Sequence, residues 1–132
     1  MKKRITGVHH IALKCNSPEE YARTIAFYTE LLGLSVKRKW GDNERGGIML
    51  DAGNALIEIF PNADDRLGQG TIRHFALGTD CVDEVINVVR NAGYKVTEEP
   101  HDIVIRSEIP FPARIAFIIG PVGEEIEIFQ ET

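Results

Sequence analysis

The chain has 132 residues, of which 43% are hydrophobic and 27% charged, with a formal net charge of −5 at pH 7. This length is enough for an ordinary domain core without disulfides, and the acidic balance argues against a nucleic-acid-binding surface. Neither Cys15 nor Cys81 belongs to a C-x-x-C pair, and no apolar run is long enough for a signal peptide or a membrane span. We therefore expect a cytoplasmic protein that binds neither nucleic acid nor membranes.

The first half has the pattern of a strand, a helix and three further strands. Residues 5–15 alternate between apolar and polar side chains, as a half-buried strand does. Ser17 and Pro18 are typical of a helix start, apolar residues then recur at spacings of three and four, and Gly33 is placed to end the helix. The following strands are predicted at 35–40, 47–51 and 55–60.

The second half repeats this order after a polar segment, 61–70, that has no periodicity and is predicted to be a link. Residues 71–78 have the pattern of a strand, and apolar residues between 82 and 89 indicate a helix that Gly93 ends. Later strands are predicted at 94–98, 114–119 and 124–130. The irregular stretch 100–112 is predicted to be a loop beside the site, or else a solvated connector without a role.

Each half is thus a β-α-β-β-β module, the first at about residues 5–62 and the second at about 71–131. A module of this size is too short to bury its sheet alone. We therefore predict that the two modules pack as a single domain over residues 1–132, or that they exchange with a partner chain.

Two short segments of the first half recur in the second. Residues 8–13 (VHHIAL) match 72–77 (IRHFAL), and residues 55–60 (ALIEIF) match 124–129 (EEIEIF). The repeat superposes His10 on His74 and Glu58 on Glu127. Two imidazoles and two carboxylates at equivalent points suggest a metal ion bound on a pseudo-twofold axis.

The strand pattern supports this prediction. Because side chains alternate along a strand, Ile57 and Ile59 must face the helix, which leaves Glu58 on the opposite face; the same holds for Glu127. Two carboxylates aimed into one cavity need a cation or a shared proton. A mixed set of nitrogen and oxygen ligands with open positions is more typical of a catalytic divalent ion than of structural zinc.

Two other histidines are left out of the predicted metal set. His9 is matched by Arg73 in the repeat, which makes it the outward-facing neighbour of His10, and His101 has no counterpart in the first half. Any one of the four predicted ligands, taken alone, would be interpreted as a structural or solvent-facing residue. Their occurrence in both repeats favours the metal site.

These segments, together with FYTELLGL at 27–34 and GPVG at 120–123, resemble the vicinal oxygen chelate superfamily, which includes glyoxalase I. The resemblance implies an α+β fold in which two tandem βαβββ modules form a curled mixed sheet around a metal-binding cleft. It implies a homodimer and a divalent metal ion, with nickel, cobalt or zinc favoured and manganese or iron as alternatives. The ligand set that it implies is His10, Glu58, His74 and Glu127.

The resemblance also implies a reaction on a small-molecule substrate. A glyoxalase I-like lyase would isomerise the hemithioacetal of methylglyoxal and a thiol such as glutathione to a 2-hydroxyacyl thioester, through an enediolate stabilised by the metal. Glu127 would be the base and Glu58 its partner, and both are counted as catalytic. Lys14 and Asn62 match substrate-binding positions of the family, but an exposed strand lysine and a turn residue are equally good interpretations.

One departure leaves the substrate open. The turn at 120–123 has valine where the family commonly has an aspartate, and this change puts the thiol and the glyoxalase reaction in question. The alternatives are another metal-dependent isomerase or epimerase of the superfamily, or a resistance protein that sequesters a small molecule and needs no catalytic ion.

Overall fold

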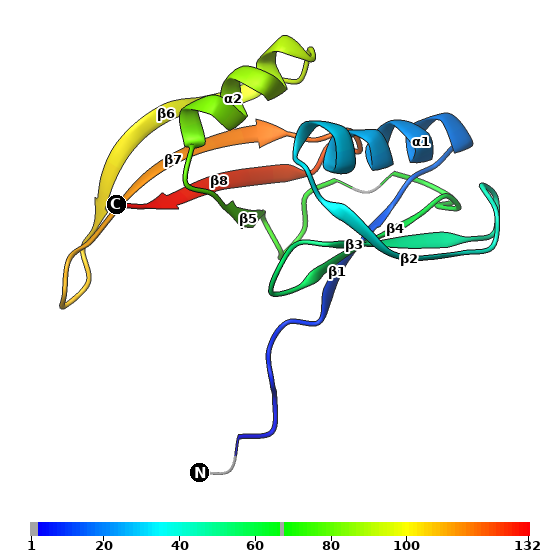
Figure 1. Cartoon of the computed structure of the whole chain (residues 1–132), viewed down its shortest axis with the longest axis horizontal. Coiled ribbons are helices and arrows are strands. Elements are labelled where there is room, and N and C mark those ends of the chain that lie inside the picture. Colours follow the sequence, from blue (N-terminus) through cyan, green and yellow to red (C-terminus); the bar gives the residue numbers. More distant parts are fainter. Residues whose placement is uncertain (1–2, 67) are drawn as a thin grey trace. The chain divides into compact units, whose positions relative to one another are not determined.

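The computed structural model describes residues 3–66 and 68–132, which form two compact units. Each unit contains one four-stranded mixed sheet with a helix on one face, and the fold is α+β (Figure 1). The predicted β-α-β-β-β order is confirmed in both units. The two units are therefore two copies of one module.

The first unit has the sheet order β1-β4-β3-β2, in which β1 and β4 are parallel and the other neighbours antiparallel. Strand β1 begins only at His10, so residues 5–9 of the predicted strand lie outside it. The elements are β1 (His10–Lys14), α1 (Pro18–Ala26), a π-helical turn η1 (Phe27–Leu31), β2 (Ser35–Trp40), β3 (Gly47–Asp51) and β4 (Leu56–Phe60).

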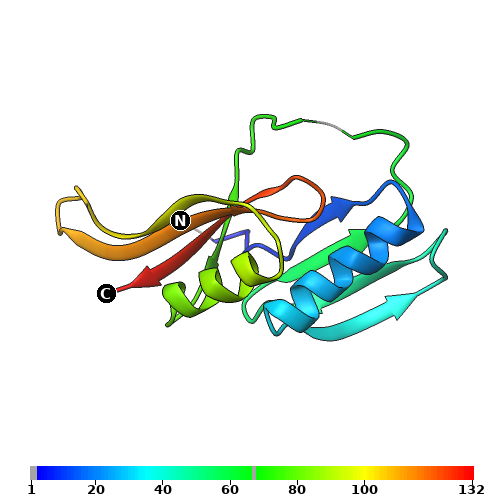
Figure 2. The same ribbon diagram turned by 90° about the horizontal axis from the view of Figure 1, so that it is seen from above.

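Helix α1 starts as the sequence predicts, but it ends at Ala26, and the π-helical turn η1 continues the helical stretch to Leu31, before the predicted end at Gly33. The Ser17 hydroxyl accepts a hydrogen bond from the backbone N–H of Glu20 at 3.1 Å, and Pro18 is the first helical residue. After the π-helical turn, Gly33 has φ +81°, a left-handed conformation that glycine adopts without strain. The helix lies across one face of the sheet (Figure 2), where Ile57 and Ile59 of β4 are fully buried.

The second unit has the equivalent sheet order β5-β8-β7-β6, again with one parallel pair, β5 and β8. Its core contains Val82, Ile86 and Val89 of the helix and Ile126 and Ile128 of the sheet, all at most 1% exposed. The elements are β5 (Phe75–Gly78), α2 (Val82–Asn91), β6 (Val96–Ile105), β7 (Phe111–Ile119) and β8 (Glu125–Glu131).

The predicted loop at 100–112 is wrong. Strands β6 and β7 run through it as a long antiparallel hairpin, and only residues 106–110 lie outside the strands. The loop was predicted because of the prolines. However, Pro100 lies in β6, an edge strand in which a missing N–H is tolerated, and the register of β6 against β7 shifts between Glu98 and His101.

Across the two described ranges, no helix has both the length and the apolar character needed to cross a membrane. Cys15 is buried, with its Sγ atom 3.4 Å from the hydroxyl oxygen of Thr24, and Cys81 is exposed.

Candidate metal centre

The first unit brings His10 and Glu58 together, and we call this pair the first half-site. In the parallel ladder Ala12 is the partner of Glu58, so His10, two residues earlier in β1, has its side chain on the same face. The Nε2 atom of His10 lies 3.4 Å from Oε1 of Glu58. The predicted alternation along the strands is what produces this contact.

The second unit does the same with His74 and Glu127, the second half-site. His74 comes immediately before β5, and Ala76 in that strand is the partner of Glu127 in β8. The Nε2 atom of His74 lies 3.3 Å from Oε1 of Glu127. The repeat predicts that His10 and Glu58 are equivalent to His74 and Glu127. In each unit the same two atoms, Nε2 and Oε1, lie at nearly the same distance.

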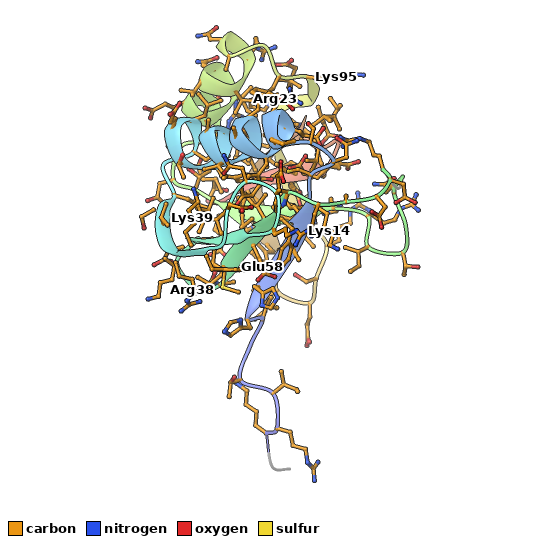
Figure 3. All side chains as sticks on the ribbon, turned by 90° about the vertical axis from the view of Figure 1, so that its right-hand side faces the viewer. Lys14, Arg23, Arg38, Lys39, Glu58 and Lys95 are labelled. Atoms are coloured by element: carbon orange, nitrogen blue, oxygen red, sulfur yellow. The ribbon has the colours of Figure 1, made fainter. Side chains whose placement is uncertain are left out.

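Both carboxylates lie on the face of their sheet that is turned away from the helix. Figure 3 shows Glu58 on the side of the first sheet opposite α1, and the residue is only 8% exposed. Among the residues that the structure describes, His10 is its one hydrogen-bonding or ionic partner. A buried carboxylate with a single imidazole beside it is costly, and a bound cation would offset that cost.

The separation of the donors suits a transition-metal ion. A nitrogen and an oxygen bound to one ion at about 2.1 Å, in tetrahedral or octahedral geometry, lie about 3.0–3.4 Å apart. The 3.4 Å of the first half-site and the 3.3 Å of the second fall in this range. Imidazole nitrogen with carboxylate oxygen is also a donor set that borderline divalent ions accept.

Neither half-site is a complete metal centre within its own unit. In the described part of each unit, no three side chains of histidine, cysteine, aspartate or glutamate gather closely enough to hold an ion. Two protein ligands are fewer than the three or four that zinc sites use. Binding of one ion by all four ligands therefore stays a prediction.

The two predicted substrate-binding residues lie in different surroundings. Lys14 is in β1 on the same face as Glu58, and its Nζ atom is 5.9 Å from the centre of the Phe60 ring, a cation–π contact. Asn62 is exposed and follows the end of β4. Lys14 is thus on the face that bears the half-site, and a role for either residue in binding substrate stays a prediction.

Sequence reasoning missed two residues that contact the predicted ligands. The Nδ1 atom of His9 lies 2.9 Å from Nδ1 of His10, and the ring of Phe117 meets His74 edge-on, with centroids 5.3 Å apart. The match of His9 to Arg73 in the repeat predicts an outward-facing neighbour of His10, but β1 begins only at His10, so the strand does not direct the His9 side chain away from that of His10. Phe117 pairs with Glu127 in the sheet, and this register cannot be obtained from a repeat of short motifs.

Comparison with known proteins identifies the family. Residues 7–127 match the model of the "Glyoxalase/Bleomycin resistance protein/Dioxygenase superfamily". The chain belongs to this superfamily. The resemblance to vicinal oxygen chelate proteins is therefore confirmed.

Several relatives have names that suggest an activity. A probable lactoylglutathione lyase from Synechocystis is 30% identical, with 82% of this chain and 85% of that protein covered. An uncharacterized Bacillus subtilis protein, YwkD, is 27% identical over 96% of this chain and 98% of its own length. The chain spans between 32% and 39% of the length of the plant relatives named lactoylglutathione lyase.

Solved structures support the same fold. The trypanothione-dependent glyoxalase I of Leishmania major superposes with a TM-score of 0.70 at 23% identity, covering 96% of this chain and 88% of that one. At this level of identity the likeness concerns the fold.

Proposed function

We propose that the chain is a divalent-metal-dependent lyase of the glyoxalase I type, acting on the hemithioacetal of a 2-oxoaldehyde such as methylglyoxal and a thiol such as glutathione. The product would be a 2-hydroxyacyl thioester. The single observation that carries the proposal is the pair of matching half-sites, His10 with Glu58 and His74 with Glu127, at 3.4 and 3.3 Å. Relatives named lactoylglutathione lyase support the choice of reaction within the superfamily.

In this proposal the four side chains of the half-sites hold the ion, with nickel, cobalt or zinc favoured. The bound cation supplies Lewis-acid stabilisation of the negative charge that develops on two adjacent substrate oxygens. Each imidazole offers its Nε2 atom, the one that faces the carboxylate. A set of four requires both half-sites, either from one chain or from two chains of a homodimer.

Glu127 is proposed as the base. Its carboxylate takes the proton from the hydroxyl-bearing carbon of the hemithioacetal and returns it to the neighbouring carbon, while the hydroxyl proton moves to the oxygen of that neighbouring carbon. The first carbon is thereby oxidised and the second reduced within the substrate, without nicotinamide or flavin. Glu58 is the partner carboxylate. The ring of Phe117 beside His74 adds an apolar surface to the second half-site, and such surroundings favour proton transfer between carboxylate and carbon by excluding water.

Lys14 is proposed to bind a carboxylate of the thiol. Its ammonium group lies over the Phe60 ring, which holds the cation on the same face of the sheet as Glu58. Asn62, which is exposed after β4, is proposed to donate its amide to the same part of the substrate.

The test combines metal analysis of the purified protein with an assay for thioester formation from methylglyoxal and several thiols. We expect about one divalent ion per complete set of four ligands, and turnover with at least one thiol. Glu127→Gln should retain the metal and lose about 10²- to 10⁴-fold in kcat. Glu131→Gln is the matched control, because Glu131 lies at the exposed end of the same strand.

Two results would contradict the proposal in different ways. Bound metal without turnover on any thiol would exclude the lyase reaction and favour another proton-shuttling isomerase of the superfamily. Failure of the protein to bind nickel, cobalt, zinc, manganese or iron would exclude the metal centre itself and favour a protein that sequesters a small molecule.

A further inference from the structure

The first half-site contains a contact that the second lacks. The Nδ1 atoms of His9 and His10 are 2.9 Å apart, a hydrogen-bonding distance, and the two rings are nearly perpendicular, at 84°. The backbone carbonyl of His9 accepts a hydrogen bond from the N–H of Leu56 at 3.0 Å, which holds this residue against the start of β4. Both ring nitrogens of His10 therefore have a partner: Glu58 at Nε2 and His9 at Nδ1.

The two partners determine where the protons lie. A neutral imidazole carries one N–H, so its second nitrogen can only accept a hydrogen bond. Without a cation, the carboxylate of Glu58 favours the N–H of His10 at Nε2, and the Nδ1 atom of His10 then accepts from Nδ1–H of His9. A cation at Nε2 of His10 would displace that proton, so His10 would carry its N–H at Nδ1 and His9 would have to accept it.

His9 can meet both demands because a neutral imidazole donates at Nδ1 when its single N–H proton is there, and accepts at Nδ1 when that proton is on Nε2. The equivalent residue in the second unit cannot. Arg73 has only donors, and its Nη1 atom donates to the carbonyl oxygen of Gly70 at 3.3 Å. The histidine pair is thus a property of the first half-site alone.

We propose that His9 is a positioning residue for His10: it accepts the Nδ1 proton of His10 when a cation binds, and so fixes the tautomer and ring orientation in which Nε2 is a ligand. This inference rests on the proposed function, in that it takes His10 to be a metal ligand. Hydrogen bonds to the far nitrogen of a ligating histidine typically contribute 10- to 100-fold to metal affinity. Because both rings are exposed, we expect the lower end of that range here.

The first experiment measures zinc affinity by calorimetry at about pH 8, where an unperturbed histidine is neutral. His9→Ala should weaken zinc binding about tenfold. His9→Gln should stay within about threefold of the wild type, because an amide can also turn its donor or its acceptor toward Nδ1. His9→Arg, which makes the first half-site like the second, should be as weak as His9→Ala, and Arg73→Ala should bind as the wild type does.

The second experiment determines the tautomers directly, by ¹⁵N NMR of protein labelled at histidine. In the metal-free protein we expect N–H at Nε2 of His10 and at Nδ1 of His9. After zinc is added, the N–H groups should be found at Nδ1 of His10 and at Nε2 of His9. If His9 had only a structural role, its replacement would alter stability, but zinc binding would not change the tautomers of His9 and His10.

The possible failures are distinguishable. If wild-type protein binds neither zinc nor nickel, cobalt, manganese or iron, the proposed function falls and the inference falls with it. If zinc binds but His9→Ala matches the wild type, or the tautomers of His9 do not change, only the inference is overturned. A ¹⁵N shift showing zinc on Nδ1 of His9 would also overturn it, since His9 would then be a ligand.

Discussion

The two half-sites agree where the sequence repeats and differ where it does not. Histidine and glutamate lie on the same face of equivalent strands in both units, with Nε2–Oε1 distances of 3.4 and 3.3 Å. Their neighbours are different: His9 contacts His10, whereas the ring of Phe117 contacts His74. The two units thus share the histidine and glutamate predicted to be ligands, whereas the residues that contact those ligands differ.

If the matching geometry means matching roles, removing either histidine should have the same large effect. We expect His10→Ala and His74→Ala each to lower zinc affinity by more than about 100-fold, because each removes a direct ligand, and the loss of a hydrogen bond to a ligating histidine alone costs about 10- to 100-fold. Equilibrium dialysis against zinc measures the loss. His101→Ala is the control, since His101 contacts Glu98 and the carbonyl of Glu99 in the edge strand and lies in neither half-site.

Unequal losses of zinc affinity in the two variants would show that the half-sites do not have matching roles. A protein that binds zinc normally after His74→Ala, but not after His10→Ala, would have an ion that the second half-site does not help to hold. Four-ligand binding would then be wrong, even with both His–Glu contacts intact in the structure.

The same comparison explains what could be predicted from sequence. The half-sites were predictable because alternation along a strand and an internal repeat are both local signals, and together they assign His10, Glu58, His74 and Glu127 to faces. The hairpin of β6 and β7 was not predictable, because edge-strand tolerance of Pro100 depends on sheet order, which is a non-local property. The contact of His9 was missed because it depends on the residue at which β1 begins.

The hairpin turns of the two units offer a test on stability. In the first unit Gly46 lies where an added Cβ would overlap the backbone carbonyl oxygen of Trp40, whereas the turn of the second unit, 106–110, contains no glycine. Gly46→Ala should lower the free energy of unfolding by about 1–3 kcal/mol, as overpacking does when backbone must move. Urea unfolding followed by circular dichroism measures it.

The control for that variant comes from the second turn. Glu108 is exposed there, and its replacement by alanine should change the free energy of unfolding by less than about 0.5 kcal/mol. If Gly46→Ala leaves the free energy of unfolding unchanged, the backbone of the first turn can shift to make room for the added methyl group. The turns of the two hairpins would then tolerate substitution equally.

The two helix starts differ at the N-cap side chain. Ser17 caps α1 by accepting from the N–H of Glu20, whereas Cys81, at the equivalent position of α2, makes no side-chain cap. Ser17→Ala should therefore cost about 1 kcal/mol in free energy of unfolding, and Cys81→Ala close to nothing. Chemical denaturation of the two variants side by side checks this, and equal costs would mean that the cap is not what stabilises α1.

The smallest expected effect concerns the first turn of each helix. Asp83 in α2 accepts two hydrogen bonds from the Arg114 guanidinium, at 2.8 and 2.9 Å, and this contact lowers the pKa of Asp83 below its ordinary value. Glu19, at the equivalent position of α1, has no ion pair among the residues that the structure describes.

A carboxyl group whose pKa is lowered by folding stabilises the protein above its unfolded pKa, near 4, and that stabilisation disappears as the pH falls through the folded pKa. Asp83→Asn should therefore lower Tm slightly at pH 7, and the difference from the wild type should shrink toward zero as the pH falls through the lowered pKa of Asp83. Because the pair is exposed, salt should shrink it as well. Glu19→Gln should show neither dependence in thermal melts, and a pH dependence shared by both variants would trace the effect to the helix dipole that both acids face, instead of to Arg114.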